Sequence, residues 1–200
     1  MKQTLGTAKA NSLHPFQNIR GGPGAAPAVQ QNMNSLEINI EDPRWGKLEL
    51  DTLACRTAEI TLRHLAFDPE ICEISVLACD ASRIAALNGD YREKPTPTNV
   101  LSWPADERAA DTPGARPIPP QAGPDGMVEL GDIALCYDTC LSEATASELA
   151  FAAHVTHLIV HGILHLLGYD HISDLDAALM EGLEVEILGK MGLHDPYSNI

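Results

Sequence analysis

The sequence predicts a small α+β domain in which a four-stranded mixed sheet is packed by about five helices. Short stretches of alternating apolar and polar residues, a pattern typical of strands, occur between residues 36 and 137. Longer stretches with apolar residues at helical spacing lie between the strands and make up most of the chain after them. A chain of 200 residues is long enough to bury the core of one such domain.

The N-terminal part of the chain is predicted to lie outside this domain. Residues 1–34 are polar, rich in Gly and Pro, and without apolar periodicity. We therefore expect a disordered extension followed by a domain of residues 35–200, with Met33 as an alternative translation start. The first lysines are not followed by an apolar run, so we expect no secretory signal.

Strands and helices alternate in the first half of the predicted domain. Apolar residues bounded by Pro, Gly or turn residues predict strands over 36–40, 73–78 and 99–103. One helix is predicted over about 48–67. A second, shorter helix is predicted to begin at a Ser82 cap and to end at Asn88-Gly89.

The second half of the domain is predicted to start with a long loop. The stretch from Pro104 to Gly126 contains six prolines, so we expect residues 105–126 to form a mobile or lid-like loop. A fourth strand follows over about 128–137, and its change of alternation at Gly131-Asp132 predicts a bulge. Three helices complete the domain, near 142–150, from there to 167, and after a Ser173 cap.

The composition restricts the class of protein. The formal net charge is −15, from 13 basic and 28 acidic residues, and such a surface repels nucleic acids at long range. Five cysteines without disulfide spacing indicate a reduced, cytoplasmic protein. The most apolar window, residues 150–169, holds four histidines, which favours a metal-bearing core helix over a membrane span.

The clearest chemical signal is the stretch His161-Gly-Ile-Leu-His165-Leu-Leu-Gly168-Tyr-Asp-His171. The first two histidines are four residues apart, so they lie on one face of a helix and can bind one ion. Gly168 can end that helix in a left-handed conformation, after which His171 can return as the third ligand. Three histidines and a water form an open Zn²⁺ site of the catalytic type.

This spacing is that of the metzincin proteases with one change, because Gly162 stands where those enzymes carry their catalytic Glu. The sequence therefore predicts the metal cage without the protease general base. On the same helix, His154 and His157 are predicted to be core groups or partners of the ligands. Asp170 is predicted to form the turn or to orient a ligand.

Two further groups of residues were considered for binding. Cys136 and Cys140 lack a second pair for a zinc site, so both are predicted to be small buried residues. Arg83, Arg92 and Lys94 make one of the few locally basic regions in an acidic chain. A guanidinium group in this region could hold a phosphate beside the metal.

The histidine motif resembles the signature of the YbeY endoribonucleases, which are bacterial rRNA maturation factors. The resemblance covers about residues 36–197. Four further motifs support it: Leu87-Asn88 with Tyr91-Arg92, Thr98-Asn99-Val100-Leu101-Ser102-Trp103, Gly131-Asp132-Ile133 and Asp195-Pro196-Tyr197. The chain departs from the family pattern in its N-terminal extension and in the longer loop from Pro104 to Gly126.

The resemblance implies a zincin-like fold with one Zn²⁺ per chain on His161, His165 and His171. It implies single-strand-specific RNA cleavage in the maturation of the 3′ end of 16S rRNA and in ribosome quality control. The expected partners are rRNA precursors and ribosomal proteins of the small subunit, with neither DNA nor a membrane. By matching position, Arg92 is the catalytic arginine of the family, and His161 is expected to take part in catalysis as well as in metal binding.

Two other functions stay open on the sequence alone. A zinc peptidase or amidohydrolase of the same fold would share the histidines, although without the Glu it should be slow. A non-catalytic ribosome-assembly factor with structural zinc would suit the acidic charge, although three histidines leave a coordination position open. For the nuclease, Gly162 leaves three candidate proton acceptors: zinc-bound hydroxide, a substrate phosphate, or a group outside the motif.

Overall fold

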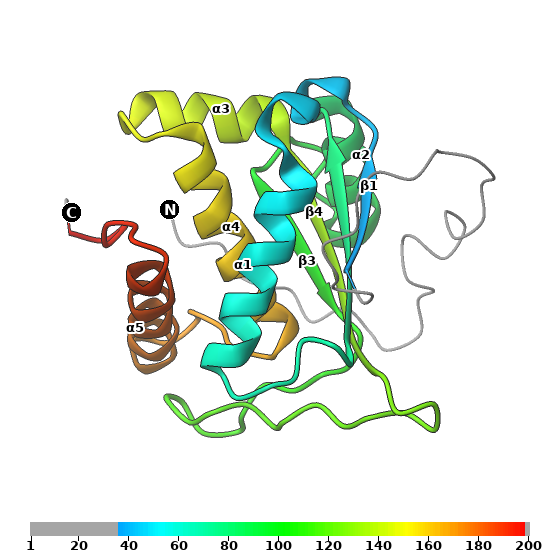
Figure 1. Ribbon diagram of the computed structural model, residues 1–200, viewed down its shortest axis with the longest axis vertical. Coiled ribbons are helices and arrows are strands. Elements are labelled where there is room, and N and C mark those ends of the chain that lie inside the picture. Colours follow the sequence, from blue (N-terminus) through cyan, green and yellow to red (C-terminus); the bar gives the residue numbers. More distant parts are fainter. Residues whose placement is uncertain (1–35, 199–200) are drawn as a thin grey trace.

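The computed structural model describes residues 36–198, and the disorder expected for residues 1–34 concerns a segment outside this range. The strands form one sheet in the order β1-β2-β4-β3 (Figure 1). β1, β2 and β4 are parallel, whereas β3 pairs antiparallel with β4 at one edge. The predicted α+β class and mixed sheet are confirmed. The strands are β1 (Leu36–Ile40), β2 (Cys72–Cys79), β3 (Val100–Pro104) and β4 (Val128–Cys136).

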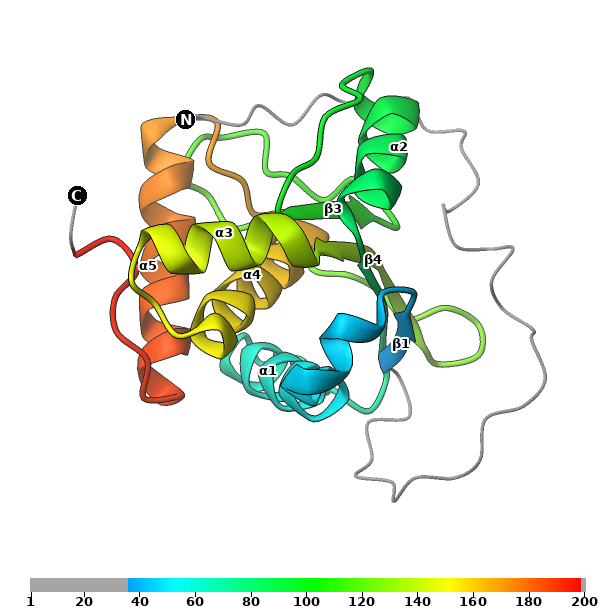
Figure 2. The same cartoon turned by 90° about the horizontal axis from the view of Figure 1, so that it is seen from above.

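Helices cover both faces of the sheet (Figure 2). The helices are η1 (Pro43–Leu48, a 3-10 helix), α1 (Leu50–His64), α2 (Ala81–Arg92), α3 (Tyr137–Ala146), α4 (Phe151–Leu166) and α5 (Asp174–Lys190). Alternate strand positions point to opposite faces, so Val76 and Ile133 pack in the core with α1 and α4, and Leu77 and Ala134 pack with α2. α5 packs against α1 and α4, away from the sheet.

α4 therefore lies between the sheet and α5, in the middle of the domain. Ten of its residues are buried, including Val160 and Leu164 toward α5 and Ile159 and Ile163 in the core with the sheet. Within residues 36–198, no single helix is long and apolar enough to cross a membrane, and α3 with α4 passes that test only as a pair bent by 117°.

The predicted boundaries of α2 are wrong at both ends. Asp80 caps the helix by accepting a hydrogen bond from the Arg83 amide, so Ser82 lies inside the first turn. The helix also continues beyond Gly89, because Glu93 is the residue that adopts the left-handed conformation. Gly89 lies inside the helix at a closely packed point, since a Cβ there would lie only 3.3 Å from the Cβ of Pro95.

One further helix was not predicted, and another begins earlier than predicted. η1 occupies the stretch between β1 and α1, and α3 begins at Tyr137 instead of near 142 and ends before 150. Aromatic packing accounts for both, because Trp45 of η1 contacts Tyr137 of α3 and Phe151 of α4 with ring centroids 5.3 and 5.7 Å apart. Local periodicity carries no information about such contacts between distant segments.

The predicted bulge in β4 is present, one residue earlier than expected. Pairing with β2 shifts between Glu129 and Gly131, which leaves Leu130 as the extra residue. Gly131 has a φ of +129°, and a Cβ at this position would lie 2.1 Å from the carbonyl oxygen of Trp103. The close approach of β3 to β4 therefore requires glycine here.

Residues 105–127 join β3 to β4 without a helix or strand, as the prolines predict. The start of this loop is nevertheless packed, because Arg108 is only 4% exposed. Its guanidinium group donates hydrogen bonds to the carbonyl oxygens of Leu166 (3.0 Å) and Glu129 (3.1 Å). The mobility expected for the rest of the loop stays a prediction.

We expect Gly131→Ala to lower the free energy of unfolding by about 2–4 kcal/mol, because the added Cβ overlaps the backbone of β3. Urea denaturation of the purified variant measures this. The control is Gly182→Ala in α5, where a Cβ meets no atom within 4 Å, and where alanine should stabilise the helix by up to about 1 kcal/mol. Equal stabilities for the two variants would contradict the packing described for the bulge.

Candidate metal centre

The three predicted metal ligands lie together at the C-terminal end of α4. His161 and His165 are one helical turn apart, and their Nε2 atoms are separated by 3.0 Å. Gly168 ends the helix with a φ of +91°, and the Gly168 amide donates to the His165 carbonyl, as expected for a left-handed C-cap. His171 then returns, so one nitrogen from each ring lies within 4.8 Å of the others.

Hydrogen bonds fix the orientation of two of these rings. Nδ1 of His161 lies 2.7 Å from a carboxylate oxygen of Glu184, and Nδ1 of His165 lies 2.9 Å from the carbonyl oxygen of Tyr169. Both partners are acceptors only, so each Nδ1 carries the proton and donates. Each Nε2 then points toward the common centre with its lone pair available.

The nitrogen set fits a divalent ion. A tetrahedral zinc ion with Zn–N bonds of about 2.1 Å places its ligands about 3.4 Å apart, close to the spacing of the His161 and His165 nitrogens. Burial, together with the charges that His161 and His171 can carry, lowers the pKa of His165 to about 3. His165 is therefore neutral near pH 7, as a metal ligand must be.

Glu184, which sequence reasoning missed, supports the centre from behind. This α5 residue is fully buried, and its carboxylate accepts hydrogen bonds from His157 (3.2 Å), from His161 (2.7 Å) and from the Tyr197 hydroxyl. Burial alone would raise the pKa of Glu184, but the hydrogen bonds and charges of the two histidines outweigh burial and lower it. The carboxylate is thus ionised and holds the His161 ring in place.

The sequence contains one signal that could have identified this carboxylate. Met180, Glu184 and Leu188 follow each other at four-residue spacing, and all three are buried in the structure. A charged residue in a buried row of a helix normally has a specific partner. The interpretation of His157 as a partner of the ligands agrees with its bond to Glu184, whereas His154 bonds to Glu143 (3.0 Å) and not to this network.

Arg92 and the His171 turn lie close enough to interact electrostatically. Burial lowers the pKa of Arg92, and the charge of Asp170 acts in the opposite direction. Asp170 also accepts a hydrogen bond from the His171 amide at 2.7 Å, so the turn-forming role predicted for it is seen. The predicted basic cluster is split, however, because Arg83 lies at the other end of α2 and pairs with Glu41 at 3.1 Å.

Gly162 faces the sheet and not the three histidines. A Cβ at this position would lie 2.9 Å from Cδ1 and 3.3 Å from Cγ1 of Ile133 in β4. The position at which a metzincin carries its Glu is therefore filled by helix–sheet packing in this chain. Cys136 and Cys140, also considered as ligands, are buried free thiols, as predicted.

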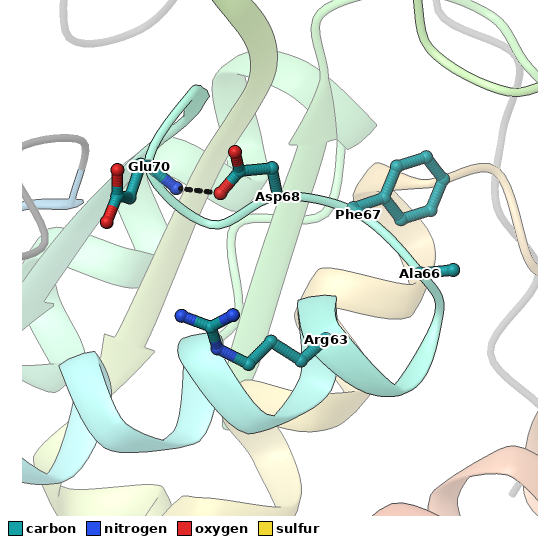
Figure 3. Close-up of a pocket in the computed structure, with 5 residues that line it drawn as sticks. All are labelled: Arg63, Ala66, Phe67, Asp68 and Glu70. Carbon is teal, nitrogen blue, oxygen red and sulfur yellow. Dashed lines mark hydrogen bonds between the residues drawn. The ribbon is translucent and has the colours of Figure 1, made fainter.

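A pocket of about 580 Å³ lies elsewhere, at the turn between α1 and β2 (Figure 3). Two of its charged groups have partners, because Arg63 pairs with Glu59 and the Asp68 carboxylate accepts a hydrogen bond from the Glu70 amide. The remaining lining residues are Ala66 and Phe67, and none of the predicted site residues contributes to it. The histidine cluster is therefore the better candidate for a functional site.

Comparison with known proteins shows which family the chain resembles. The family model described as Endoribonuclease YbeY matches residues 36–192. An Endoribonuclease YbeY of Ruegeria pomeroyi is 58% identical over 82% of this chain and 98% of its own length. That of Dinoroseobacter shibae is 55% identical over 82% of this chain and 90% of its own. A solution structure from Thermotoga maritima covers 82% of this chain and 99% of its own at 22% identity, with a TM-score of 0.48.

Fold and site together define an α+β protein with a cluster of three histidines that could hold a metal ion. The chain belongs to the Endoribonuclease YbeY family. The matched range begins at the first strand and ends just beyond α5, so it includes every described element that forms the centre.

We expect Glu184→Gln to weaken metal binding by about ten- to a hundredfold, because a neutral amide holds the His161 imidazole less firmly than a carboxylate does. Competition with a chromogenic chelator measures the affinity. The control is Glu186→Gln two residues further along α5, where the side chain is 67% exposed and contacts His64. If both variants bind metal with the affinity of the unchanged protein, Glu184 does not support the centre in this way.

Proposed function

We propose that this protein is a zinc-dependent endoribonuclease that cleaves single-stranded RNA during rRNA processing. The observation that carries the proposal is the convergence of His161, His165 and His171 within 4.8 Å, in a chain of the Endoribonuclease YbeY family. The histidines come from one side, from a helix and the turn that follows it, which leaves a coordination position for a water or a substrate oxygen.

Zinc is the metal that suits this set of donors best. Three imidazoles are typical ligands of catalytic zinc, and two of them, His161 and His165, have their tautomers fixed here, whereas Mg²⁺ and Ca²⁺ prefer oxygen ligands. When bound, zinc would lower the pKa of a coordinated water toward about 7 and polarise a phosphoryl oxygen. His161 would contribute as a ligand whose position is set by Glu184.

Arg92 is proposed to stabilise the negative charge that develops on the phosphate in the transition state. Its position at the C-terminal end of α2, partly buried and within the electrostatic reach of Asp170, places a guanidinium group near the turn that carries His171. A planar guanidinium can contact two phosphoryl oxygens at once. Partial burial strengthens such an interaction, because less water screens it.

The cellular role is proposed from the family resemblance. It comprises maturation of the 3′ end of 16S rRNA and ribosome quality control in the cytoplasm, with small-subunit ribosomal proteins as partners. The acidic composition, with a net charge of −15, supports a role for basic proteins in bringing the enzyme to its RNA.

The rival function, a zinc peptidase, is disfavoured by the packing of Gly162. The peptidase mechanism requires a general base next to the metal, and here that sequence position faces Ile133 in the core. The structural-zinc alternative lacks comparable support, because structural zinc sites are normally closed by a fourth protein ligand. Among residues 36–198, the only group of His, Cys, Asp or Glu side chains that could hold a metal ion has three members, so a fourth protein ligand is not found there.

We expect one zinc ion per chain in protein purified without chelator, measured by elemental analysis. Removing it should abolish RNA cleavage and lower the melting temperature, because the ion joins α4 to the turn before α5. His171→Ala should do the same. His154→Ala, on the same helix but bonded to Glu143, is the control that should keep the metal. Metal-free protein with full activity and unchanged melting would contradict the proposal.

We expect Arg92→Ala and Arg92→Lys to lower cleavage of a labelled single-stranded RNA by roughly ten- to a thousandfold, with zinc content and melting temperature unchanged. Lysine should not rescue activity, because a point charge cannot replace a planar fork of donors. Arg83→Ala, at the opposite end of the same helix, is the control. Loss of zinc or of folding in the Arg92 variants would assign this residue a structural role instead.

A further inference from the structure

The loop between β3 and β4 is attached to both sides of the turn that carries His171. On one side, the backbone of Arg108 packs against Gly168, where a Cβ would lie 2.8 Å from the Arg108 carbonyl carbon. On the other side, the Gly114 amide donates to the Asp176 carboxylate in the first turn of α5 at 2.7 Å. Figures 1 and 2 both show the loop passing beside the start of α5.

These attachments hold Arg116 in a defined place. Two residues before it, Gly114 is bonded to α5, and two residues after it, the Ile118 amide donates to the Arg108 carbonyl at 2.9 Å. Arg116 itself is exposed, and among residues 36–198 no salt bridge involves it. A short stretch between two anchored points thus presents a cation that is not neutralised by a carboxylate of the described domain.

Arg116 lies in the part of the loop that is anchored beside the turn carrying His171. Its anchored neighbours are Gly114, bonded to Asp176 after this turn, and Ile118, bonded to Arg108, whose backbone packs against Gly168 before the turn. The turn itself contributes to the centre, because the carbonyl oxygen of Tyr169 accepts the hydrogen bond that orients His165.

The other arginine of the loop is not available for a ligand. The guanidinium of Arg108 is used in bonds to the Leu166 and Glu129 carbonyls and to the Asp106 carboxylate. Of the two loop arginines, Arg116 is therefore the one whose guanidinium group is exposed and forms no salt bridge within residues 36–198. In a chain with a net charge of −15, an exposed cation at this place gives the loop beside the His171 turn a local positive charge.

We propose that Arg116 binds a phosphate of the RNA strand adjacent to the phosphate that is cleaved. The inference rests on the proposed RNA substrate and adds a residue that positions the strand without acting on the reacting atoms. Such a contact is made equally in the ground state and in the transition state. Removing it should therefore raise KM and leave kcat unchanged.

The test compares Arg116→Ala and Arg116→Lys in the zinc-loaded protein. Alanine should raise KM for a labelled single-stranded RNA about three- to thirtyfold with kcat unchanged, whereas lysine should restore most of the affinity because the site is exposed and needs only a charge. Binding of a fluorescent 2′-O-methyl RNA oligonucleotide can be followed by anisotropy in increasing KCl. The salt slope, which is the slope of log K against log[KCl], should be smaller in magnitude by about 0.7 in the alanine variant.

The matched control is Arg63→Ala, an arginine that is 60% exposed and lies at the end of α1 with Glu59 as its partner. It should leave KM and the salt slope unchanged. Three outcomes overturn the proposal: an unchanged KM and slope in Arg116→Ala, a loss of melting temperature or zinc in that variant, or a lysine variant as weak as alanine. Failure of the nuclease proposal would appear differently, as wild-type protein that binds the oligonucleotide but cleaves no RNA.

Discussion

The bond between Glu184 and His161 connects the metal centre to the packing of the domain. A fully buried carboxylate is unfavourable unless it is paired, and here its partners come from α4 and from the segment after α5. The position of α5 on α4 is therefore set by polar bonds as well as by apolar contacts such as Leu164 with Met180. In this arrangement the chemistry of the centre and the stability of the C-terminal half depend on the same contacts.

Local patterns in the sequence predicted most of the fold and the three ligands. His161 and His165 are related by helical spacing, and Gly168 is a recognisable helix end, so neither inference needs a distant contact. The role of Glu184 could not be predicted in this way, because it lies 23 residues from His161 and only the fold brings them together. The same holds for the start of α3, which depends on contacts between Tyr137 and Trp45.

The acidic composition and an RNA substrate are compatible once distance is considered. At physiological ionic strength, charges separated by more than about 8 Å are largely screened, so remote carboxylates act weakly at the centre. Groups near the three histidines would dominate there, among them Arg92 and, when bound, a metal ion. The net charge is thus a poor guide to what binds at one site, although it does affect the long-range approach of a polyanion.

The contact between Gly162 and Ile133 has a consequence for the diversity of reactions this fold can support. A larger side chain at residue 162 would meet the Ile133 side chain first, so either this side chain or the helix would have to move to admit it. A carboxylate introduced there would also be directed into the interface between α4 and β4, where a charge without a partner is unfavourable. Replacing this one glycine by glutamate would therefore strain the core without placing a base beside the three histidines.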